Sequence, residues 1–127
     1  METSVELTFM TIKIGKVYTV LDKKDNYLIT IDFSHPVFEG HFLKNPILPG
    51  VMMCDIIRDI VSEKSGVRVQ LLFAKSIKFT RVIVPSENNT YKVTIVMVNE
   101  EDEYNVRADV SQDNDTYFKI NAKYKIK

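Results

Sequence analysis

One segment of this chain, residues 50–64, carries the features of a long helix and constrains the fold most. It is rich in unbranched helix formers, exceeds the length of an ordinary strand, and is followed by Ser65-Gly66, which stops a helix. Its apolar side chains cover most of the helical circumference. They are Val51, Met53, Ile56, Ile57, Ile60 and Val61. A helix that is apolar on so much of its surface is buried, and it needs a broad partner to cover it.

The remainder of the chain has the pattern of β-strands. Residues 17–20 and 27–33 are predicted strands on either side of a turn, whereas the prolines and glycines of residues 35–49 favour an irregular loop. After Gly66, apolar and polar residues alternate with period two, most clearly over residues 105–110 and 117–127. Turn-forming clusters separate successive strands, as in an antiparallel meander. These clusters are residues 85–89, 99–103 and 111–115.

One apolar helix is the natural cover for one sheet with a single apolar face. The sequence therefore predicts an α+β fold, a curved antiparallel β-sheet around one long central helix, in a single domain over residues 1–127. The length of 127 residues is usual for one domain.

Charge and cysteine content exclude several function classes. Seventeen lysines and arginines balance 17 aspartates and glutamates, so there is no overall basic signal for nucleic acid. Cys54 is the only cysteine, which rules out an intrachain disulfide or a thiolate zinc cluster. No stretch approaches the about 18 apolar residues of a membrane span, and residues 1–10 lack the apolar core of a signal peptide. We expect a cytoplasmic protein without membrane or nucleic-acid partners.

The loop that precedes the helix contains an unusual arrangement of functional groups. His41 is followed by Pro46 and Pro49, which fix two backbone angles, and then by Gly50, where the helix should begin. A helix N-terminus presents unpaired N–H groups and partial positive charge, and glycine lets an oxygen approach closely. With Asp55 these parts amount to a base, an acid and an oxyanion site, as needed to remove a proton beside a carbonyl and expel a β-hydroxyl. Spacing alone does not show that they converge.

Simpler interpretations exist for each residue. A single loop histidine is usually structural or exposed, and Asp55 could belong to a polar stripe on the helix. That stripe comprises Asp55, Arg58, Asp59 and Ser62. His35 and His41, with Asp32 nearby, could bind a metal, but no third ligand has a diagnostic spacing.

The segment "GHFLKNPILPGVMMCD" resembles the signature of the β-hydroxyacyl-[acyl carrier protein] dehydratases of the FabA/FabZ type. The later segment "AKSIKFTRVIVPSENNTY" is similar to the family's next characteristic strand and turn. The resemblance implies the hotdog fold, dehydration of a (3R)-3-hydroxyacyl thioester on acyl carrier protein to the trans-2-enoyl thioester, and no metal or organic cofactor. The pathway could be fatty acid, polyketide or aryl polyene synthesis.

Residue by residue, His41 matches the family's catalytic histidine and Asp55 its catalytic acid. Gly50 matches the glycine whose backbone N–H polarises the thioester carbonyl. The family pattern implies a homodimer in which His41 of one chain faces Asp55 of the other, with higher oligomers open. Apolar candidates for binding the acyl chain are Phe38, Phe42, Val51 and Met53.

The chain departs from the family pattern near the acid. Leu43 replaces a common proline, the acid is aspartate rather than the commoner glutamate, and residues 56–59 replace small residues and a glutamine. Arg58 lies one turn from Asp55, and a nearby guanidinium would lower the pKa that a general acid needs raised. That conflict disappears if Arg58 points to solvent.

Acyl carrier proteins are acidic, and this chain has no net charge. Docking of a carrier protein therefore needs a local basic patch. The candidates are Lys75, Lys78 and Arg81, with Lys119, Lys123 and Lys125 as the second choice. Lysines on a last strand also protect sheet edges against aggregation. Two other functions remain open on the same fold: hydrolysis of an acyl thioester, and binding of acyl chains or carrier protein without turnover.

Overall fold

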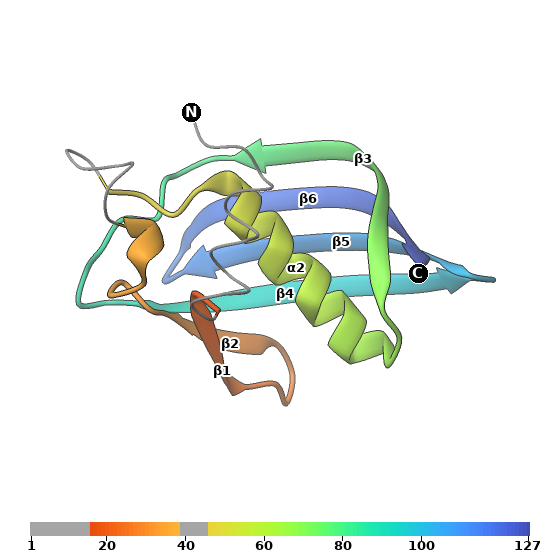
Figure 1. Ribbon diagram of the computed structural model, residues 1–127, viewed down its shortest axis with the longest axis horizontal. Coiled ribbons are helices and arrows are strands. Elements are labelled where there is room, and N and C mark those ends of the chain that lie inside the picture. Colours follow the sequence, from red (N-terminus) through yellow and green to blue (C-terminus); the bar gives the residue numbers. More distant parts are fainter. Residues whose placement is uncertain (1–15, 39–45) are drawn as a thin grey trace.

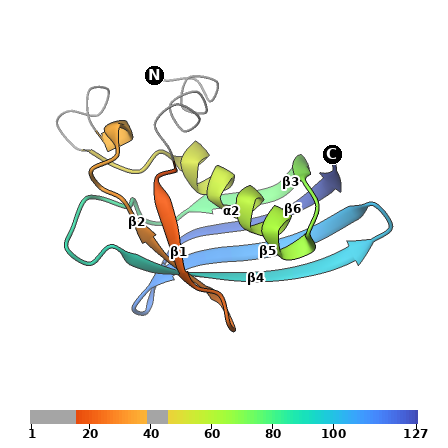
Figure 2. The ribbon, with the colours of Figure 1, turned by 60° about the horizontal axis from the view of Figure 1, so that its bottom comes forward.

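The computed structural model describes residues 16–38 and 46–127, and this part of the chain forms one long helix against a six-stranded sheet (Figure 1). The elements are β1 (Tyr18–Asp22), β2 (Tyr27–Ile31), a 3₁₀ turn η1 (Pro36–Phe38), α2 (Gly50–Ser65), β3 (Val69–Phe79), β4 (Thr90–Glu100), β5 (Glu103–Gln112) and β6 (Asp115–Ile126). Figure 2 shows the helix lying in the concave face of the curved sheet. The predicted α+β fold is confirmed.

Local signals at both ends fix the helix. Pro49 precedes it with extended backbone angles (φ −60°, ψ 142°), and its C=O accepts the N–H of Met52 at 2.9 Å. Gly66 ends it in the left-handed conformation (φ 78°), and its N–H donates to the carbonyl of Ser62 at 3.0 Å. Glycine adopts this conformation without steric cost. The sequence-based bounds are correct to within one residue.

The buried face of α2 matches most of the predicted apolar set. Its buried residues are Met52, Met53, Ile56, Ile57, Ile60 and Val61. They pack against the inward-facing side chains of the sheet, which come mainly from β5 and β6. These include Val106, Ala108, Val110, Phe118, Ile120, Ala122 and Tyr124. Ile126, the last member of the predicted alternation, is 38% exposed at the end of its strand.

Strand order differs from the predicted meander at one strand. The order is β1-β2-β4-β5-β6-β3, so β4, β5 and β6 are sequential neighbours, whereas β3 pairs with β6 rather than β4. The reason is that the connection between β2 and β3, which contains α2, spans the face of the sheet, so β3 lies at the opposite edge from β1 (Figure 1). Two-residue turns join β4 to β5 and β5 to β6, with positive φ at Glu101 (61°) and Asp113 (55°). Positive φ suits tight hairpins because it matches the twist of the strands.

The edge strand β3 is long and apolar. It pairs with β6 from Val69 opposite Ile126 to Phe79 opposite Phe118, with register shifts between Leu71 and Phe73 and between Ala74 and Ser76. Each shift is a bulge that inserts an extra residue and increases the local twist. Five of its large apolar side chains are exposed: Leu71, Leu72, Phe73, Ile77 and Phe79.

No helix in the described ranges is long and apolar enough to cross a membrane.

Candidate active site

The segment before α2 is held in place by the segment after β3. The N–H of Leu48 donates to the carbonyl of Ile83 at 2.8 Å, and both side chains are buried. The two stretches that resemble the dehydratase pattern therefore meet at the start of the helix. This contact fixes the direction in which the first helical N–H groups point.

Gly50, the first residue of α2, lies directly against the end of β3. A Cβ at this position would be 2.7 Å from Cε1 and Cζ of the Phe79 ring, closer than real Cβ contacts allow. Phe79 is 54% exposed and its ring packs on Phe118 with centroids 5.1 Å apart. A side chain at position 50 would therefore force the Phe79 ring to move, and the absence of a Cβ lets the start of the helix lie directly against that ring.

Asp55 lies further along the same helix, five residues and about 7.5 Å of axial rise from Gly50. Its side chain is 22% exposed. Burial raises the pKa of the Asp55 carboxyl above its usual value, the Arg58 guanidinium opposes this, and the charge of Asp59 adds to it. A raised pKa is the property that a general acid near neutral pH requires.

Arg58 contacts Asp55 instead of pointing away from it. Its Nη1 lies 3.2 Å from Oδ1 of Asp55, and its Nη2 lies 3.6 Å from Oδ1 of Asp59. The predicted polar stripe therefore exists on the partly exposed face of α2. Arg58 does not point to solvent, yet it does not lower the pKa of Asp55 below its usual value. The effect of burial is larger than that of the guanidinium, so the pKa of Asp55 rises.

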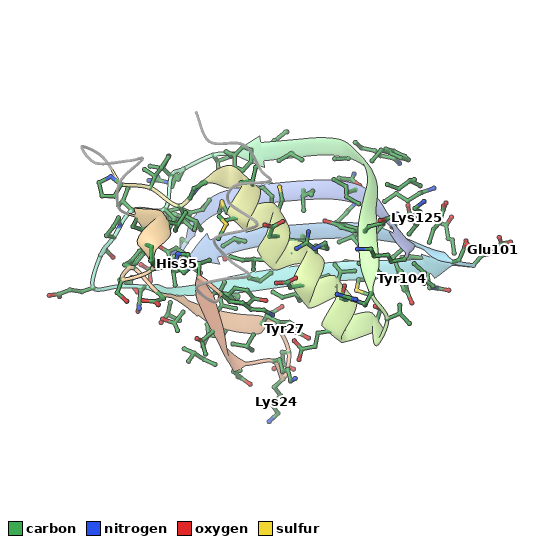
Figure 3. All side chains as sticks on the ribbon, in the orientation of Figure 1. Lys24, Tyr27, His35, Glu101, Tyr104 and Lys125 are labelled. Carbon is green, nitrogen blue, oxygen red and sulfur yellow. The ribbon has the colours of Figure 1, made fainter. Side chains whose placement is uncertain are left out.

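The second histidine, His35, is buried at the turn η1 (Figure 3). Its Nδ1 accepts the N–H of Val37 at 3.0 Å, and its C=O accepts the N–H of Phe38 at 3.0 Å. His41 and Phe42 lie outside the described residues, so the proposed base and the His35–His41 metal pair stay predictions. The described ranges contain no group of three or more potential metal ligands from His, Cys, Asp or Glu.

The other candidate acyl-binding residues lie in or beside the core. Phe38 is buried and its ring makes an edge contact with Phe33, with centroids 5.1 Å apart. Met53 is buried on α2, and Val51 is partly buried against the core. Their role in binding an acyl chain stays a prediction.

The two candidate basic patches meet at one point. Lys78 of β3 stands opposite Lys119 of β6, so one first-choice and one second-choice residue are cross-strand neighbours. Arg81 is paired with Asp115 at 3.4 Å. Lys125 lies at the other end of the sheet from His35 (Figure 3).

Two features of the site were not predicted. Phe79 beside Gly50 was missed because β3 was not expected to pair with β6, although its place in the second resembling segment was a usable signal. The contacts of Asp59 with β1 were missed too. Its Oδ2 accepts the Tyr18 hydroxyl at 3.4 Å and lies 3.7 Å from the Lys16 Nζ.

Comparison with known proteins places this arrangement in a family. Residues 20–120 match the family described as ApeI-like, ApeI dehydratase. The chain belongs to the ApeI-like dehydratase family. Among solved structures, the dehydratase heterocomplex ApeI:P from Xenorhabdus doucetiae aligns with a TM-score of 0.61 at 21% identity, over 83% of this chain and 91% of that one. An uncharacterized protein from Erwinia carotovora aligns with a TM-score of 0.54 at 19% identity, over 87% of this chain and 94% of that one. These likenesses support the hotdog fold.

Sequence relatives of this ApeI-like chain include 3-hydroxyacyl-[acyl-carrier-protein] dehydratases named FabZ. The protein from Anaplasma marginale (strain Florida) is 34% identical over 80 residues, 54% of each chain. The protein from Clostridium acetobutylicum is 28% identical over 75 residues, 54% of this chain and 53% of that one. The chain thus spans about half the length of the curated relatives it matches.

Proposed function

We propose that this ApeI-like protein dehydrates a (3R)-3-hydroxyacyl thioester carried on acyl carrier protein to the trans-2-enoyl thioester. His41 removes the α-proton, and the Gly50 N–H stabilises the enolate-like oxygen of the thioester. Asp55 donates a proton to the β-hydroxyl, which leaves as water as the double bond forms. No metal or organic cofactor takes part in these steps.

The observation that carries this proposal is the environment of Asp55. Its carboxyl is largely buried with a raised pKa, on the helix whose first N–H groups belong to Gly50 and its neighbours. A carboxyl with a raised pKa, on the same helix as a proposed oxyanion site, is suited to protonate a leaving hydroxyl. The FabZ names of the relatives support the same substrate class.

The proposal includes a homodimer formed through β3. Within the described part of the chain, β3 is an eleven-residue edge strand with exposed apolar side chains on it. Such an edge favours pairing with another strand. Pairing with β3 of a second copy would join the two sheets along this edge, in the proposed homodimer that shares His41 and Asp55 between chains.

One incubation separates the three candidate functions. Purified protein is mixed with 3-hydroxyacyl-carrier protein, and the products are identified by mass spectrometry. An enoyl thioester supports dehydration, free acid indicates a thioesterase, and unchanged substrate indicates a binding protein. A series of chain lengths in the same assay then gives the acyl-chain preference of the protein.

The role of His41 is tested with His41→Ala. We expect a loss in kcat of about 10²–10⁴-fold, which is the usual contribution of general-base catalysis. Circular dichroism and sedimentation should show an unchanged fold and oligomeric state. Retention of more than about a tenth of wild-type kcat would remove His41 from the mechanism.

Docking of the carrier protein is proposed at Lys75, Lys78 and Arg81, joined by Lys119. The double change Lys78→Glu with Lys119→Glu should raise KM for carrier-protein substrates several-fold, because steering by complementary charge mainly affects association. A short thioester mimic that lacks the carrier should be turned over normally. Lys125→Glu, at the far end of the sheet, is the matched control and should leave KM unchanged. Equal losses on both substrates would show that these lysines support the fold or active site instead.

A further inference from the structure

A continuous series of polar contacts links β1 to Asp55. On α2, the two terminal nitrogens of Arg58 reach separate carboxylates, Asp55 at 3.2 Å and Asp59 at 3.6 Å. The oxygen of Asp59 that does not face Arg58 is Oδ2. It accepts the Tyr18 hydroxyl at 3.4 Å and lies 3.7 Å from the Lys16 ammonium group. Asp59 therefore uses one oxygen for Arg58 and the other for β1.

These contacts are partly shielded from water. The side chains of Asp55, Asp59 and Arg58 are 22%, 28% and 40% exposed. Asp55 and Asp59 also line one small cavity of about 10 Å³, together with Lys16, Tyr18 and apolar neighbours. That volume is close to the space of a single water molecule. Charges in such a setting interact more strongly than fully exposed pairs do.

Few other ionisable groups face Asp55 within the described ranges. Arg58 and Asp59 come from its own helix, and Lys16 and Tyr18 come from the β1 side. Cys54 is its neighbour in sequence, and buried Tyr124 of β6 lies within electrostatic reach of Cys54 and Arg58. Burial and the charge of Asp59 raise the pKa of the Tyr18 hydroxyl, so it remains a proton donor.

We infer that Asp59 is a positioning residue for Asp55, acting through the Arg58 guanidinium that it holds between the two carboxylates. Asp59 is itself fixed to β1 by Tyr18 and Lys16. It draws the second terminal nitrogen of Arg58 away from Asp55, and its negative charge offsets that of the guanidinium. Arg58 can then orient the carboxyl of Asp55 without forcing it to remain ionised.

This inference rests on the proposed function, in which Asp55 is the general acid. It can be told apart from a purely structural role, because changes at Arg58 and at Asp59 should shift the pKa of Asp55 in opposite directions. Arg58→Gln removes the positive charge and should raise the pKa of Asp55. Asp59→Asn removes a negative charge and leaves Arg58 to Asp55 alone, so it should lower the pKa of Asp55.

The test uses two measurements on the full chain. The first follows the Asp55 side-chain carboxyl carbon by NMR across a pH titration in the wild type, Arg58→Gln and Asp59→Asn. The second is the pH dependence of kcat with a 3-hydroxyacyl-carrier protein. Its alkaline limb should move to higher pH in Arg58→Gln and to lower pH in Asp59→Asn, because the acid acts only when protonated. Asp59→Glu, which keeps the charge, should restore the limb toward its wild-type position.

Glu63→Gln is the matched control. Glu63 lies one turn beyond Asp59 on α2 and pairs with Lys23 at the end of β1, so it joins the same elements without touching Arg58. It should leave the titration of Asp55 unchanged. An Asp59→Asn protein with the wild-type Asp55 titration, or shifts in the same direction in both variants, would overturn the inference. Because NMR needs no turnover, opposite shifts in a protein that never forms enoyl product would support the inference about Asp55 and overturn only the proposed function.

Discussion

The two edges of the sheet are built in opposite ways. β1 is five residues long, has a register shift between Val20 and Asp22, and lies beside ion pairs that reach the helix, such as Lys23 with Glu63. β3 is eleven residues long and exposes Leu72, Ile77 and other apolar side chains. Short strands, bulges and lysines are the usual protection of an edge against pairing. β1 is short and irregular, whereas β3 is long and exposes several large apolar side chains despite its two register shifts and its lysines, Lys75 and Lys78.

The difference favours β3, and not β1, as the edge that pairs with another strand. β1 is joined to α2 by charged groups, among them the Tyr18 contact with Asp59 that belongs to the proposed acid site. β3 ends at Phe79, beside Gly50, where the proposed oxyanion site lies. One edge is therefore linked to the helix of the proposed acid within the protomer, and the other ends beside the proposed oxyanion site and has an open side among the described strands.

The largest expected effect comes from a charge on the β3 edge. Leu72→Lys should weaken dimerisation by about 100-fold or more, because burying an unpaired charge costs several kcal/mol and each 1.4 kcal/mol is tenfold in Kd. Sedimentation equilibrium over a range of concentrations measures the change, with circular dichroism to confirm folding. Leu21→Lys is the matched control on β1, since Leu21 is 55% exposed against 42% for Leu72. An unchanged Kd in Leu72→Lys would place the interface elsewhere.

A second prediction concerns the point where β3 meets the helix. Gly50→Ala should destabilise the protein by about 1–3 kcal/mol, because its Cβ overlaps the Phe79 ring. It should also lower kcat by about 10- to 100-fold, since small displacements of a catalytic group are costly. Thermal unfolding and steady-state kinetics give the two values.

Phe79→Ala in the same chain separates the two reasons for glycine. The double variant should regain stability, since the overlap is removed, but not kcat, since the new methyl group still stands beside the N–H. Recovery of full activity would reduce Gly50 to a packing role.

The smallest expected effect lies on the β1 side, at Asp55. A carboxyl whose pKa is raised in the folded state binds its proton more tightly there than in the unfolded chain, so it favours folding at low pH and loses that contribution as pH rises. Asp55→Asn removes this dependence. Its melting temperature should exceed that of the wild type at neutral pH, and the advantage should vanish below the ordinary aspartate pKa of about 3.9. A variant less stable than wild type at neutral pH would show that Asp55 is held mainly by favourable contacts.

Local signals account for what was predictable in the fold. Pro49 and Gly66 mark the ends of α2 within a few residues, and the alternation in β5 and β6 depends only on the period of a strand. The position of β3 was not predictable from local pattern, because it depends on where the connection that contains α2 leads the chain. Placing β3 beside β4 was therefore the main error.

The candidate site divides in the same way. Gly50 and Asp55 were proposed from residue type and from the resemblance to the dehydratases, and their catalytic roles stay predictions. The direction of Arg58 could not be predicted, because a long side chain one turn from an acid can either pair with it or extend into solvent. The contact between Phe79 and Gly50 requires the β3–β6 register. His41 remains a prediction outside the described residues.

The two bulges of β3 have a consequence for the size of any assembly. An unbroken flat edge accepts strand after strand and can grow into a fibril. An edge with extra residues near Leu72 and Lys75 is twisted and irregular, so few strands fit it in register. A copy of the same strand, related by a two-fold axis, carries matching irregularities at matching places. In the proposed homodimer two such edges would meet, the short β1 edges would be the outer edges among the described strands, and the assembly would close at two.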